Sequence, residues 1–157
     1  FEVDLARLQS NYRKIQSEVH PDKFVTASAA ERLQSMQTAT LANEAFQTLK
    51  HPTARARYLL QLQGVETLED SNTAMPPDFL MTQMEWREAI EEAQSAKDIP
   101  ALESLLATMK NEAKTMQSAL ADAIQSDSST AAQIVRKLSF IDKVSADVQQ
   151  TISRLED

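Results

Sequence analysis

The chain has 157 residues, a formal net charge of −7 and 42% hydrophobic residues, a composition typical of a folded globular protein. It has no cysteine and only 2 histidines, which excludes disulfides and any cysteine-ligated zinc or iron–sulfur site within it and predicts no bound metal or cofactor. No apolar run reaches the roughly 18 residues that span a bilayer, no secretory signal is visible, and the acidic balance argues against nucleic-acid binding, so we expect a cytoplasmic protein.

The composition predicts an all-α fold with two modules. One glycine and 5 prolines leave few turn signals, whereas good helix formers dominate. Residues 1–62 hold 8 basic and 6 acidic side chains, whereas residues 63–157 hold 8 basic and 17 acidic ones. Such an asymmetry suggests that the two halves have different partners.

The first predicted helix starts after Asp4, a favourable cap, and carries one apolar stripe of Leu5, Leu8, Tyr12, Ile15 and Val19. The residue before a proline is disfavoured in the α conformation, so Pro21 ends this helix near Val19. His20, Pro21 and Asp22 then form an exposed corner, which taken alone is more often a turn than a site. Arg13 and Lys14 give the preceding helix a basic side.

A capping box, Ser28 with Glu31, opens a second helix that runs to about Lys50. Pro52 favours the start of a third, over 53–63, and Gly64 is well placed to end it. The first two helices should form an antiparallel hairpin, whose predicted core is Leu8, Tyr12, Ile15, Leu33, Phe46 and Leu49.

The second half predicts a linker and a helical bundle. Residues 65–77 are polar and end in two prolines, which is typical of a linker. Asp78 is the expected cap of a helix over 79–97, and Pro100 opens the next helix. The cluster from Asp127 to Thr130 separates that helix from the last one. Near-heptad apolar spacing predicts a three-helix bundle over 78–157.

Several motifs, taken together in order and spacing, resemble the J-domain of co-chaperones that act on DnaK-type ATPases. They are Tyr12-Arg13-Lys14, His20-Pro21-Asp22-Lys23, Asn43-Glu44-Ala45-Phe46 with Leu49 and Pro52, and Arg55-Ala56 with Tyr58. Further blocks resemble the specialised HscB family of iron–sulfur cluster assembly over nearly the whole chain. These are Leu59-Leu60-Gln61-Leu62, Phe79-Leu80-Met81, Met84-Glu85, Arg87-Glu88 and Arg136-Lys137-Leu138 with Phe140-Ile141-Asp142-Lys143. The family's short first helix is missing except for Phe1, so we expect a segment to precede this chain.

The resemblance implies a J-domain at 1–64 and a scaffold-binding bundle at 78–157. It implies that the chain stimulates the ATPase of the chaperone HscA and delivers the scaffold protein IscU to it, which promotes cluster assembly and transfer. The chaperone-binding residues would be His20, Pro21 and Asp22, supported by Arg13 and Lys14. The scaffold-binding residues would be Leu80, Met81, Met84, Glu85, Glu88, Glu92 and Phe140.

A helical wheel of 79–97 gives the second surface independent support. Phe79, Trp86 and Ile90 fall on one side, whereas the two methionines, Leu80 and the three glutamates fall on the other. Either this helix is buried on both sides, or its second stripe contacts a partner. Since carboxylates are rarely buried without partners, the pattern favours an interface. Phe140 lies off the apolar stripe of its helix and is either a core edge or an exposed anchor, and the resemblance favours contact.

The residues offer no catalytic constellation, so we expect a protein that is not an enzyme. Glu85, Glu88 and Glu92 lack an accompanying histidine, serine nucleophile or phosphate-binding glycine loop, which makes a carboxylate-based hydrolase a distant possibility. Two further hypotheses stay open: a general J-protein that serves other clients, and a helical assembly protein whose corner is only a turn.

Overall fold

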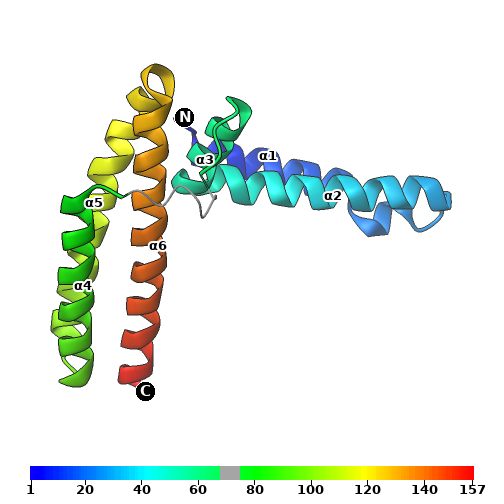
Figure 1. Ribbon diagram of the computed structural model, residues 1–157. Helices are drawn as coiled ribbons and strands as arrows, with labels where there is room; N and C mark the ends of the chain where they lie inside the picture. The colour runs from blue at the N-terminus through cyan, green and yellow to red at the C-terminus, as the bar shows by residue number, and fades with distance from the viewer. Residues whose placement is uncertain (68–74) are drawn as a thin grey trace. The chain divides into compact units, whose positions relative to one another are not determined.

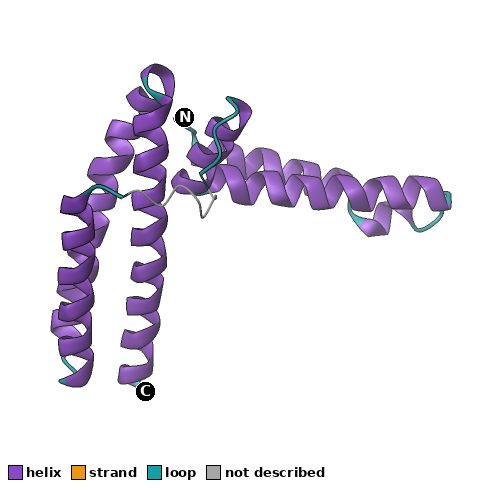
Figure 2. Cartoon of the chain, in the orientation of Figure 1, coloured by secondary structure: helices purple, strands orange, loops and turns teal. Residues whose placement is uncertain are grey.

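The computed structural model describes residues 1–67 and 75–157, which form helices joined by short loops and no strand (Figures 1 and 2). The all-α prediction is therefore confirmed. Most of the linker predicted at 65–77 lies outside the described residues. Two compact units, 1–58 and 59–157, divide the chain inside its third helix. The elements are α1 Leu5–Glu18, the 3-10 turn η1 Pro21–Phe24, α2 Ala29–Lys50, α3 Pro52–Leu62, α4 Pro77–Ser95, α5 Ile99–Ser126 and α6 Ser128–Glu156.

The hairpin of the first unit begins and ends where local chemistry predicts. The Asp4 side chain accepts a hydrogen bond from the Arg7 amide at 3.1 Å and so caps α1. Ser28 likewise accepts from the Glu31 amide at 3.2 Å at the start of α2. The two helices pack side by side, joined by η1 (Figure 1).

The predicted hairpin core is correct only in part. Tyr12 stacks on Phe46 with ring centroids 4.3 Å apart, and its hydroxyl donates to Asn43 at 2.9 Å. Ile15 and Leu33, however, are 39% and 57% exposed. Ile15 lies at the edge of its stripe, and Leu33 points to the side of α2 away from Phe46. Two packed helices bury only the centre of each apolar stripe.

A side chain of α3 binds the end of α2, and a backbone cap ends α3. The buried Arg55 side chain donates to the Leu49 carbonyl at the end of α2 and lies 4.8 Å over the Phe1 ring. Burial lowers the pKa of the Arg55 guanidinium. At the other end Gly64 adopts φ +80°, and the Val65 amide donates to the Leu60 carbonyl at 2.8 Å, which completes a Schellman cap as predicted.

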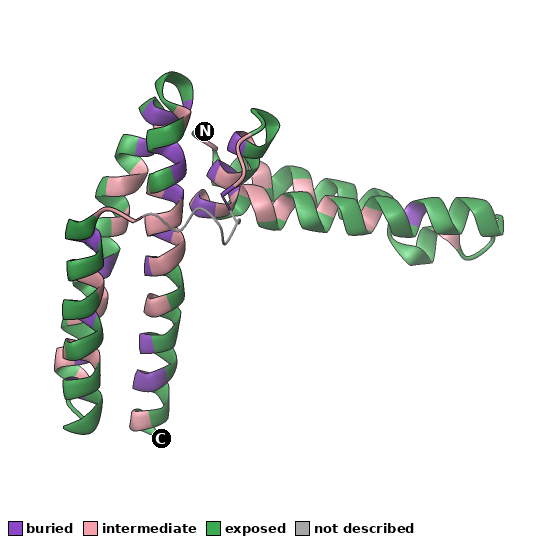
Figure 3. Ribbon diagram, in the orientation of Figure 1, coloured by how far each residue is buried: buried purple, intermediate pink, exposed green. Residues whose placement is uncertain are grey.

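Besides the end of α3, the second unit contains a three-helix bundle of α4, α5 and α6, whose buried side chains follow one stripe of each helix (Figure 3). Its fully buried side chains include Leu102, Met109, Leu120, Leu138 and Ile141. The predicted cap of α4 was wrong, because Pro76 holds the cap position. Asp78 lies within the first turn, where its negative charge interacts favourably with the helix dipole. None of the described helices is long and apolar enough to cross a membrane.

Asp127 terminates α5 and caps α6 at the tightest connection of the bundle. Its carboxylate accepts from the Thr130 hydroxyl at 2.7 Å and from the Thr130 amide at 3.2 Å. These hydrogen bonds hold the pKa of the Asp127 carboxyl below its usual range. The charged form therefore stabilises the folded state above the ordinary carboxyl pKa, and that stabilisation is lost as pH falls through the lowered value.

We expect Asp127→Asn to lower the melting temperature at pH 7 and to lose this deficit in acid. Asparagine keeps an amide-oxygen cap but lacks the charge that favours a helix N-terminus. Thermal unfolding of both proteins by circular dichroism, at pH 7 and at successively lower pH while both remain folded, measures the difference. A deficit that is equal at all these pH values would contradict a role for the charge.

Candidate functional site

The His-Pro-Asp corner stands at the end of α1 and is held by its own hydrogen bonds. The His20 Nδ1 accepts from the Asp22 amide at 3.2 Å, and the same nitrogen lies 3.5 Å from an Asp22 carboxylate oxygen. The His20 and Asp22 side chains are 58% and 89% exposed. Pro21 occupies the first position of η1, which its fixed φ favours. The corner thus presents the imidazole, the ring of Pro21 and a carboxylate to solvent.

The basic side of α1 belongs to the same unit as this corner. Arg13 and Lys14 are exposed, and they directly follow Tyr12, which anchors the helix to α2. With about 1.5 Å of rise per residue, these cations lie roughly 10 Å before the corner along the helix. A partner with an acidic surface could contact both at once.

The second predicted surface lies on α4 and is exposed. Leu80, Met81 and Met84 are 45%, 63% and 63% exposed, and the three glutamates beside them face solvent. The opposite side of the same helix buries Phe79, Trp86 and Ala93 against the bundle. The wheel therefore separated the two stripes of α4 correctly. We call the exposed set the α4 patch; it comprises Leu80, Met81, Met84, Glu85, Glu88 and Glu92.

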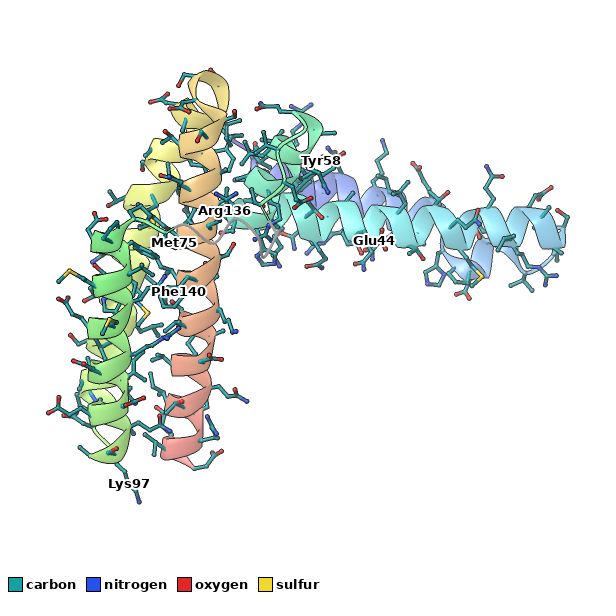
Figure 4. All side chains as sticks on the ribbon, in the orientation of Figure 1. Glu44, Tyr58, Met75, Lys97, Arg136 and Phe140 are labelled. Atoms are coloured by element: carbon teal, nitrogen blue, oxygen red, sulfur yellow. The ribbon has the colours of Figure 1, made fainter. Side chains whose placement is uncertain are left out.

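Phe140 is half-buried at the seam between α4 and α6 rather than free on the surface (Figure 4). Its ring packs edge to face with the Phe79 ring, with centroids 5.9 Å apart. It lies nearly parallel to the Trp86 ring, with centroids 6.4 Å apart. Arg87 lies over the ring, 5.7 Å from its centroid. Phe140 is thus the outer member of an aromatic cluster, and its role in binding stays a prediction.

A groove along the same seam was not predicted from the sequence. It has a volume of ≈ 360 Å³, and α4 and α6 contribute its walls: Arg87, Ile90, Glu91, Gln94, Phe140, Lys143, Val144, Asp147, Val148 and Thr151. Each helix alone shows these residues at ordinary helical spacing. Only the packing of α4 beside α6 makes them a groove.

The described residues offer no metal site, because no group of three or more histidine, aspartate and glutamate side chains gathers there. The chemistry of the two surfaces is that of binding: a polar corner beside cations in one unit, and an apolar patch bordered by carboxylates in the other.

An exposed His-Pro-Asp corner on a helical hairpin, followed by a three-helix bundle, defines a J-domain co-chaperone with a second helical module. Residues 75–149 match the family model described as the HSCB C-terminal oligomerisation domain. The whole chain is 47% identical to the co-chaperone protein HscB homolog of Ralstonia nicotianae, and 99% of it is 48% identical to that of Burkholderia mallei; each match covers 90% of the relative. The chain belongs to the HscB family of co-chaperones.

Two solved structures share the fold. Chaperone HscB from Vibrio cholerae aligns over 98% of this chain and 91% of its own, with a TM-score of 0.85 and 38% identity. Human co-chaperone protein HscB aligns over 95% of this chain and 75% of its own, with a TM-score of 0.88 and 31% identity. The likeness extends through both units, so both candidate surfaces lie within the shared fold.

Proposed function

We propose that the protein is an adaptor that couples an iron–sulfur scaffold protein, IscU, to a DnaK-type chaperone, HscA, in the cytoplasm. The corner and the basic side of α1 engage the chaperone and stimulate its ATPase. The α4 patch, with Phe140, binds the scaffold, and delivery of the scaffold promotes cluster assembly and transfer. The observation that carries the proposal is the presence of both exposed surfaces, on separate units, in a member of the HscB family.

This function requires no catalytic group in the chain. A protein that binds the hydrolysis-competent state of an ATPase more tightly than its other states shifts the ATPase toward that state. The exposed corner is suited to such recognition because its polar groups are already ordered by hydrogen bonds. The adaptor therefore needs no cofactor of its own, and we assign the J-domain to 1–64, a linker to 65–77 and the scaffold-binding module to 78–157.

The α4 patch has the physical character of a protein-binding surface. Methionine side chains are flexible and polarizable, so they adapt to irregular partner surfaces. Exposed apolar groups gain free energy when a partner removes them from water. The glutamates around them favour a partner with cations at its rim and speed its association.

The direct test is steady-state ATP hydrolysis by HscA, measured alone, with this chain, with IscU and with both. We expect stimulation by this chain and a further increase when IscU is present. Absence of stimulation would refute the chaperone half, and absence of IscU binding in a separate titration would favour a general J-protein that serves other clients.

Arg13→Ala is expected to raise severalfold the concentration needed for half-maximal ATPase stimulation, because an exposed interfacial charge contributes up to about 1 kcal/mol. Binding of IscU should be unchanged, since the scaffold surface lies on the other unit. Arg154→Ala removes an exposed cation from α6 and is the matched control. Loss of both activities in Arg13→Ala would contradict two independent surfaces.

A further inference from the structure

The groove between α4 and α6 has an apolar floor and a charged rim. The two helices run side by side in the same direction (Figure 1), and each supplies residues one turn apart. Phe140, Ile90 and Val144 provide apolar lining, and Phe140 closes one end against the aromatic cluster. An open groove of ≈ 360 Å³ therefore suits one or two side chains of a protein partner.

Arg87 is the cation at the Phe140 end of the groove, whereas Lys143 lies one turn beyond Phe140 on α6 and the rim carboxylate Asp147 lies one turn beyond Lys143. Glu91, one turn beyond Arg87, lies on the same wall. The Arg87 guanidinium lies over the Phe140 ring rather than against a carboxylate. A guanidinium held over a ring can still donate its N–H groups to a carboxylate.

The groove is continuous with the α4 patch. Leu80, Met84, Arg87 and Glu91 are spaced by four, three and four residues, so they follow one another along one side of α4. Leu80 and Met84 belong to the patch, whereas Arg87 and Glu91 line the groove. A segment that crosses the patch can therefore enter the groove without a change of direction.

We propose that the α4–α6 groove is a further part of the scaffold-binding surface and takes a segment of the partner in which an apolar side chain lies next to a carboxylate. The apolar side chain fills the space against Phe140 and Ile90, and the carboxylate pairs with Arg87. The inference rests on the proposed function, because it names the partner chemistry of the same surface. Charge complementarity selects this occupant: the patch is bordered by acids and the adjoining end of the groove by the Arg87 cation, so the partner needs a cation beside the patch and a carboxylate at the groove end.

The test is an isothermal titration of IscU into folded protein carrying Arg87→Glu, with Lys110→Glu as control. Both changes reverse one exposed charge in the bundle, but Lys110 lies on α5 and does not line the groove. We expect Arg87→Glu to weaken binding at least tenfold and Lys110→Glu to change it less than twofold. Arg87→Lys keeps the charge but lacks the paired donors, so its affinity for IscU should lie between those of Arg87→Glu and Lys110→Glu.

Trp86 supplies an independent readout, because it is the one tryptophan of the chain and stacks near Phe140 at the end of the groove. We expect saturating IscU to shift its fluorescence emission, with the same titration of Trp86→Phe subtracted as the blank. Unchanged emission, together with equal affinities for the Arg87→Glu and Lys110→Glu variants, overturns the groove proposal. If the Arg87→Glu and Lys110→Glu variants still bind IscU and a further Met84→Ala substitution weakens that binding, the proposed function stands without the groove. If the unmodified chain binds no IscU, the groove proposal and the proposed function both fail.

Discussion

Replacing His20 by glutamine is expected to reduce ATPase stimulation of HscA to the basal rate. The imidazole Nδ1 accepts the Asp22 amide proton and orders the corner while the ring faces solvent. Glutamine is longer and has more rotatable bonds, so ordering it in the complex costs more conformational entropy, and it lacks the flat ring. Steady-state hydrolysis at saturating concentrations of the variant measures the loss.

The chain contains its own control for this experiment. His51 is also exposed and also precedes a proline, Pro52, but it lies between α2 and α3 rather than at the corner. His51→Gln should stimulate the ATPase like the unmodified chain. His20→Gln should keep its circular dichroism and its affinity for IscU, because the exposed side chain contributes no core packing. Full stimulation by a folded His20→Gln protein would remove the corner from the mechanism.

Helix boundaries were predictable because their causes are local. Asp4, Ser28, Asp127 and Gly64 each satisfy backbone groups within a few residues of themselves. Asp78 was assigned wrongly because two prolines precede it, and the helix begins with the second of them. A local pattern can therefore place a helix end to within a residue or two, but it does not choose among adjacent capping candidates.

The contacts between helices were less predictable than the helix boundaries. The wheel of α4 separated a buried side from an exposed one, because periodicity reports which residues share a face. It could not show that Phe140 meets Trp86 from another helix, since that depends on the register of α4 against α6. The groove was missed for the same reason. Ile15 was overestimated as core because periodicity does not report how many neighbouring helices cover a stripe, whereas Leu33 was assigned wrongly although its spacing from Phe46 already places it on another side of α2.

The two surfaces also differ in how they should respond to salt. The corner lies in the half with net +2, whereas the α4 patch lies in the half with net −9. Interactions between exposed charges weaken as salt screens them, whereas burial of apolar side chains does not. Chaperone coupling through the cations of α1 should therefore be more sensitive to salt than the contribution of Leu80 and Met84 to scaffold binding.

The double substitution Leu80→Ala/Met84→Ala is expected to weaken IscU binding by about a hundredfold. Full burial of a leucine or methionine side chain is worth about 1.5–3 kcal/mol, and a hundredfold loss corresponds to about 2.8 kcal/mol. Both side chains are about half exposed or more in the free protein, so a partner can bury most of their surface. Isothermal titration measures the affinity, and circular dichroism checks that the bundle remains folded.

The matched control is Met36→Ala/Leu41→Ala on α2. Met36 is 63% exposed, as is Met84, and Leu41 is 67% exposed, but both lie in the other unit. The control should bind IscU normally. Phe140→Ala needs a separate check of thermal stability, since it also removes packing against Phe79 and Trp86. If the folded Leu80→Ala/Met84→Ala protein binds IscU as tightly as the control does, the exposed stripe of α4 is not the scaffold-binding surface.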